Sequence, residues 1–146
     1  MVLILFGGIA LLSGCVTTSP FETQQIQGSV IRNIRVSSEP GDAEIYVNNM
    51  LVGRTPSQPG EARTVPLNVQ YIVTKYGGLF PTAQNTTQPI KPISQFALTV
   101  SKEGYKDVAE PIEYGDVYRY HITFAMAEDY TLLKKDYYHF VLEKKK

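Results

Sequence analysis

The sequence predicts an all-β domain, a small antiparallel β-sandwich that carries one long inserted loop and follows an apolar leader. Two observations favour this fold. Ten tyrosines and six phenylalanines accompany many valines, isoleucines and threonines, the residue types that suit a half-buried pleated surface. Short segments with alternating apolar and polar residues are separated by turn-forming residues, a pattern typical of strands. The 146 residues are enough for one domain.

The first expected strand is a β-branched run over residues 30–38, and a turn at 39–42 follows it. Pro40 fixes φ there, and glycine or aspartate tolerates the bend. The next segment, residues 43–47, alternates between an apolar and a polar face. Its apolar face consists of Ala43, Ile45 and Val47, and its polar face of Glu44 and Tyr46.

A hairpin turn is expected at Asn48-Asn49, because asparagine adopts left-handed backbone conformations more readily than most residues. Residues 50–52 return as a short strand, which ends at Gly53-Arg54-Thr55-Pro56. A further strand is expected over Leu67–Lys75.

Residues 76–92 are predicted to be a long loop, because they contain two adjacent glycines and three prolines. Loops longer than about 12–15 residues are usually functional or disordered. Tyr76 and Phe80 are therefore the candidate contacts to a partner. The alternative is that Leu79 and Phe80 fold back and cap an open sheet edge.

The second half of the chain supplies further expected strands. The segment 106–114 contains Pro111, which suits an edge strand. The clearest alternation in the chain runs from Tyr118 to Met126, and the closing strand repeats it. The apolar positions of the closing strand are Tyr138, Phe140 and Leu142.

The pieces at 30–56 and 96–143 resemble a PEGA domain, a small β-sandwich-like module of bacterial and archaeal envelope and surface proteins. The resemblance is carried by the turn at 36–43, the hairpin strand 45–48, the close at 52–56 and the Lys-x-Gly-Tyr turn at 102–105. Gly41 and Asp42 are exchanged relative to the usual order of the pattern, and Asn49 replaces a commoner glycine. The resemblance implies a single module over residues 29–146.

The leader, residues 1–14, has no charged residue and is shorter than the roughly 20 residues of a membrane-spanning helix. It has the length of a signal-peptide apolar region. The sequence Leu12-Ser13-Gly14-Cys15 resembles the lipobox of bacterial lipoproteins. The resemblance implies cleavage before Cys15 and lipid attachment to it, so that palmitate-type acyl chains hold the protein on a membrane.

Two features bear on this interpretation. No Lys or Arg precedes Cys15, which departs from the usual signal peptide. The alternative is a buried apolar strand or plain membrane helix with a chance cysteine. The lipoprotein resemblance also bears on location. Gram-negative lipoproteins that stay at the inner membrane usually have Asp directly after the cysteine. Val16 therefore favours the outer membrane, facing the periplasm, in a Gram-negative cell. Residues 15–28 are expected to be the lipidated cysteine and a flexible tether, because they are rich in Thr, Ser and Gln.

The sequence contains no recognisable catalytic constellation, and no cofactor or metal site is predicted. His121 and His139 lie on separate expected strands as solvated residues; the alternative, a shared metal, would need further ligands. The formal net charge is zero, which argues against nucleic-acid binding. The carboxylates are interpreted as turn formers and outer-face residues.

Five tyrosines are alternative candidates for an aromatic platform that binds sugar rings, but cross-strand packing is the favoured explanation for them. These residues are Tyr46, Tyr118, Tyr120, Tyr137 and Tyr138. The sequence therefore leads to a non-catalytic, lipid-anchored envelope protein whose β module binds or scaffolds another envelope protein. The alternative is a module that binds cell-wall glycan, peptidoglycan or surface polysaccharide.

Overall fold

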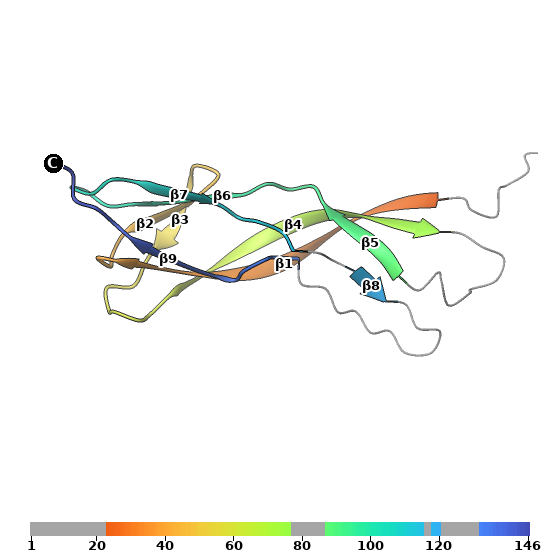
Figure 1. Cartoon of the computed structure of the whole chain (residues 1–146), viewed down its shortest axis with the longest axis horizontal. Coiled ribbons are helices and arrows are strands. Elements are labelled where there is room, and N and C mark those ends of the chain that lie inside the picture. Colours follow the sequence, from red (N-terminus) through yellow and green to blue (C-terminus); the bar gives the residue numbers. More distant parts are fainter. Residues whose placement is uncertain (1–22, 77–86, 116–117, 121–131) are drawn as a thin grey trace, which may run out of the picture.

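The computed structural model of the protein describes residues 23–76, 87–115, 118–120 and 132–146 (Figure 1). The described residues form an all-β structure, which confirms the predicted fold class. Their strands are β1 (Thr23–Glu39), β2 (Glu44–Val47), β3 (Met50–Arg54), β4 (Arg63–Tyr76), β5 (Thr87–Pro92), β6 (Ala97–Ser101), β7 (Val108–Pro111), β8 (Tyr118–Tyr120) and β9 (Tyr137–Val141). Within these ranges, no helix is long and apolar enough to cross a membrane.

The strands form two sheets of a sandwich (Figure 1). The five-stranded sheet has the order β8-β5-β4-β1-β9, and the four-stranded sheet has the order β3-β2-β6-β7. The described strand pairs are antiparallel except β1 and β9, which run parallel with Arg35 opposite Tyr137. Parallel neighbours require a long crossover, and here the chain passes through the other sheet between β1 and β9.

The core lies between the two sheets and follows from the alternation of side chains along each strand. Ala43, Ile45 and Val47 are all buried, so the predicted inner face of β2 is confirmed. The closing strand also buries its predicted apolar positions. Side chains from both sheets fill the core, including Ile34, Val36, Val65, Leu67, Val69, Ile45, Leu98, Val100, Tyr138, Phe140 and Leu142.

The long ribbon of β1 and β4 extends beyond the region where the two sheets overlap (Figure 1). It corrects the C-terminal half of the tether predicted over residues 15–28, because residues 23–28 pair with residues 71–76 and are strand. Residues 15–22 lie outside the described part of the chain. A Cβ on Gly28 would lie 2.6 Å from Tyr71 Cζ, so the tyrosine ring packs over the glycine backbone. This cross-strand contact helps to hold residues 23–28 in the strand, although the segment has little apolar periodicity.

The predicted long loop is also wrong at both of its ends. Tyr76 is the last residue of β4, and Thr87–Pro92 forms β5. The reason for the second strand is Ile90, which is buried and pairs with Val73 of β4. Residues 77–86 lie outside the described part of the chain.

The predicted hairpin turn is confirmed. Asn48 and Asn49 have φ angles of 48° and 65°, in the left-handed region that such a turn requires. The prediction that Pro111 marks an edge strand is confirmed as well, since β7 is the last strand of the four-stranded sheet.

Candidate functional site

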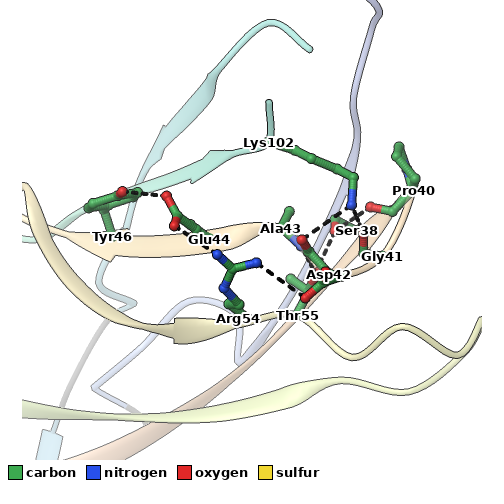
Figure 2. Close-up of polar contacts among 10 residues, drawn as sticks. All are labelled: Ser38, Pro40, Gly41, Asp42, Ala43, Glu44, Tyr46, Arg54, Thr55 and Lys102. Atoms are coloured by element: carbon green, nitrogen blue, oxygen red, sulfur yellow. Dashed lines mark hydrogen bonds and ion pairs between the residues drawn. The ribbon is translucent and has the colours of Figure 1, made fainter. Parts of the chain in front are cut away.

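A chain of hydrogen bonds joins the turn after β1 to the end of β3 (Figure 2). Thr55 is buried directly after β3, and its Oγ1 accepts the Ala43 backbone N–H at 2.9 Å. Ser38 Oγ donates to the Pro40 carbonyl oxygen at 2.8 Å. The 2.7 Å contact between the two side-chain oxygens therefore uses the Thr55 proton. Because buried hydroxyl groups are costly unless they are bonded, we interpret Thr55 as a folding residue.

The same turn explains the exchanged order of Gly41 and Asp42. A Cβ on Gly41 would lie 2.4 Å from the Pro56 carbonyl oxygen, so only glycine fits there. Asp42 has a φ of 58°, a left-handed conformation that aspartate adopts more readily than most residues. Backbone geometry thus requires glycine at position 41 and is compatible with aspartate at position 42.

Charged side chains cover this turn on its solvent side (Figure 2). Lys102 Nζ donates to the carbonyl oxygens of Gly41 at 2.8 Å and Asp42 at 3.3 Å. Arg54 bridges the carboxylates of Asp42 at 3.4 Å and Glu44 at 3.0 Å. These groups line a shallow surface cavity. Since they bind one another, we interpret the cluster as reinforcement of the turn. Exposed ion pairs of this kind contribute little each.

The structure does not bring the five tyrosines together as a glycan platform. Tyr46 lies on the four-stranded sheet and donates its hydroxyl to Glu44 at 2.6 Å; this hydrogen bond raises the pKa of Tyr46. Tyr137 is exposed on β9, whereas Tyr138 points into the core. The remaining two tyrosines lie in β8 of the five-stranded sheet.

His139 is exposed on β9, as predicted, and it contacts the neighbouring β1. Its Nδ1 lies 2.7 Å from Ser37 Oγ, and its Nε2 lies 3.9 Å from the Glu39 carboxylate. The Ser37 hydroxyl is buried and also contacts the Tyr137 hydroxyl at 2.8 Å, so a substrate cannot reach it. Within the described ranges, no three metal-ligating side chains gather, and His121 lies outside them.

Two ion pairs close the side of the sandwich between the β7 end and the segment before β9. Lys134 binds Glu113 at 2.7 Å, which lowers the pKa of Glu113 and raises that of Lys134. Lys135 binds Glu110 and also lies 4.3 Å from the centre of the Tyr138 ring.

Tyr138 Oη is buried without a hydrogen-bond partner in the described structure. Burial raises the pKa of Tyr138, and the nearby glutamates add to the effect.

We expect the free energy of unfolding to fall as the pH rises above about 10, the ordinary pKa of tyrosine. The unfolded chain loses the Tyr138 proton there, whereas the folded chain retains it because its pKa is raised. Urea unfolding from pH 8 to pH 11 should therefore show the stability of Tyr138→Phe increasing relative to the parent chain. A stability difference that stays constant with pH would contradict this expectation.

The most unusual exposed feature is β3, at the edge of the four-stranded sheet. The exposed fractions of Met50, Leu51 and Val52 are 71%, 58% and 39%. A strand with one buried face would alternate, but here three consecutive apolar residues face solvent. Such a run on a sheet edge is typical of a surface that another chain covers. We refer to Met50, Leu51 and Val52 as the β3 edge.

The β3 edge was not identified from the sequence, although the sequence contains an indication of it. Three consecutive apolar residues cannot all lie on the inner face of one strand, since neighbours point to opposite faces. The Tyr46–Leu51 pairing follows a register shift in which Val52 has no opposite residue. This bulge was not visible in the sequence pattern.

The site residues predicted from sequence lie mostly beyond the described part of the chain. Cys15, the lipobox residues Leu12, Ser13 and Gly14, and Phe80 are all in the undescribed ranges. Tyr76 ends β4, where its backbone pairs with Thr23. Of these predicted site residues, the described part of the chain therefore places only Tyr76.

The fold and its surface define an all-β module without a recognisable catalytic centre in the described ranges. Residues 31–70 match the family model of the PEGA domain. No curated protein and no solved structure gave a significant match. PEGA is a non-catalytic family of β modules often found in extracellular proteins, so the match supports a binding or scaffolding module. The β3 edge lies inside the matched region.

Proposed function

We propose that the protein is a non-catalytic, lipid-anchored protein of the bacterial cell envelope whose β-sandwich binds another envelope protein. The observation that carries the binding role is the β3 edge, an exposed apolar run on a sheet edge that no described strand covers. The lipobox at Leu12–Cys15 supports the anchor. Each buried methylene of an acyl chain contributes about 0.8 kcal/mol to membrane binding.

In this proposal the β1–β4 ribbon acts as a spacer between the membrane and the binding surface. Cys15 lies eight residues before Thr23, a separation that spans at most about 28 Å. The 17-residue β1 adds about 55 Å at roughly 3.3 Å per residue. The hairpin of β2 and β3 follows the far end of β1 (Figure 1). The ribbon would hold the β3 edge well away from the lipid and within reach of a neighbouring protein.

We expect the full chain to incorporate labelled palmitate in cells and to fractionate with membranes. Cys15→Ser removes the acceptor thiol, so the label should be lost and the protein should leave the membrane fraction. Met50→Ser, which changes the β3 edge and leaves the lipobox intact, is the control and should keep the label. Label that persists in Cys15→Ser would refute the anchor.

The binding role is tested by photo-cross-linking in cells from three exposed positions. A photoreactive amino acid replaces Leu51, Glu103 or Val141 in separate variants. A covalent adduct with an envelope protein from any position supports the proposal. Absence of adducts from all three, together with retention of the chain on purified sacculi, would favour the glycan alternative.

A further inference from the structure

The backbone of β3 offers hydrogen-bonding groups on its outer side. Met50 faces Val47 across a two-residue hairpin turn, a position where both residues exchange hydrogen bonds. The next residue, Leu51, therefore directs its N–H and C=O away from β2. β3 is the end strand of its sheet, so no described strand pairs with this side.

β7, the other end strand of the same sheet, is protected against pairing with a further strand, whereas β3 is not. β7 contains Pro111, which has no N–H to donate, and Glu110 there is paired with Lys135. Proline and charged side chains are the usual means of preventing edge-to-edge pairing. The β3 edge contains neither between Met50 and Val52, so it can accept another strand.

A cation lies at the end of the β3 edge. A Cβ on Gly53 would lie 3.4 Å from Arg63 Nε and 3.7 Å from Arg63 Cζ, so the arginine side chain occupies the space beside the glycine. Arg63 is exposed at the start of β4, and its guanidinium has no ion-pair partner in the described structure. Neighbouring Arg54, in contrast, is neutralised by two carboxylates. Arg63 is thus available to bind a carboxylate, which guanidinium groups bind in bidentate fashion.

We propose that β3 binds an extended segment of a partner protein as an added strand, and that Arg63 binds a carboxylate of that segment. The inference rests on the proposed protein-binding function and specifies its surface and the chemistry of its partner. Backbone hydrogen bonds to Leu51 supply general affinity, and side chains on alternate positions of the segment contact the β3 edge. The carboxylate, from Asp, Glu or a chain terminus, fixes the register of the segment.

A second copy of this chain fits the surface less well than a different partner. A copy that paired through its own β3 would present Met-Leu-Val-Gly-Arg, which contains no carboxylate for Arg63. A stable dimer interface buries about 1,200–2,000 Å², far more than two five-residue strands provide. The charge and the small area therefore both favour an acidic, extended segment of another protein.

The test selects ligands from a display library of random eight-residue peptides with the full chain as bait. We expect selected peptides to combine apolar residues at alternate positions with one Asp or Glu. Arg63→Glu should weaken binding of these peptides at least 10-fold, and a peptide in which Lys replaces the acidic residue should recover affinity for that variant. Arg35→Glu, a charge reversal at an exposed arginine of β1, is the matched control and should change affinity less than 2-fold.

Hydrogen exchange tests the added strand separately from the carboxylate contact. Hydrogen exchange of the Leu51 amide should slow at least 10-fold when a selected peptide is added, because the outward N–H becomes bonded. Leu51→Pro removes this N–H and should abolish binding; its fold is checked by circular dichroism, and Arg63→Glu tests the proposal independently if Leu51→Pro does not fold.

Three results would overturn the inference: no enriched peptide, peptides that bind Arg63→Glu and the parent chain equally, or binding that leaves Leu51 exchange unchanged. The binding function itself would survive if cross-linked protein adducts still formed at Val141 or Glu103.

Discussion

Ile34→Ala is expected to lower the free energy of unfolding by about 2–5 kcal/mol, the usual cost of truncating a buried isoleucine. Ile34 is 0% exposed in the middle of β1 and packs in the core between the sheets. The substitution removes apolar contacts and leaves a cavity that a close-packed interior only partly fills. Urea unfolding of the full chain measures the change.

Ile31→Ala is the matched control, because it makes the same chemical change in the same strand. Ile31 is 59% exposed, so its replacement should cost less than about 1 kcal/mol, the range of strand propensity. Similar losses for both variants would show that the alternation along β1 does not determine which side chains form the core.

Thr55→Val is expected to lower the free energy of unfolding by about 2–3 kcal/mol, although the two side chains have nearly the same shape. The hydroxyl of Thr55 bonds the Ala43 N–H and the Ser38 hydroxyl in a buried position. Valine leaves the Ala43 N–H without an acceptor and removes the donor to Ser38 Oγ, which keeps only its own bond to the Pro40 carbonyl oxygen. An unsatisfied buried group costs about 1–3 kcal/mol. Thermal and urea unfolding should agree on the loss.

The control for Thr55→Val is Thr64→Val in β4, where the threonine is exposed to solvent. It should change stability by no more than about 0.5 kcal/mol. Thr55→Ser keeps the hydroxyl and should retain most of the stability that valine loses. If Thr55→Val and Thr64→Val were equally mild, the hydrogen-bond chain at this turn would have no important role in the fold.

Local pattern was sufficient to predict much of the framework. The alternation of Ile45 with its polar neighbours identified the inner face of β2, and Asn48-Asn49 identified a left-handed turn. Both features depend on nearest neighbours in the chain. The ends of the elements were harder to predict, since Thr23–Gly28 is held in a strand by pairing with β4 and by the Tyr71 ring over Gly28.

Properties that join distant segments could not be read from the sequence. Nothing local to β9 specifies that Tyr137 lies beside Arg35 in parallel. The Arg63 side chain reaches Gly53 only because the two sheets face each other at that edge. The apolar run of the candidate site is visible in the sequence, but the place of β3 at the end of its sheet and the approach of Arg63 depend on distant segments.

The pairing of β1 with β9 also determines how quickly the native state can form. Ser37 and His139 contact each other across 102 residues of chain, whereas β2 and β3 are joined by a two-residue turn. Bringing distant segments together costs loop-closure entropy before any contact stabilises them. We therefore expect folding in milliseconds to seconds, as in other β-sandwiches dominated by non-local pairs. The β2–β3 hairpin would form early, and docking of β9 would complete the core last.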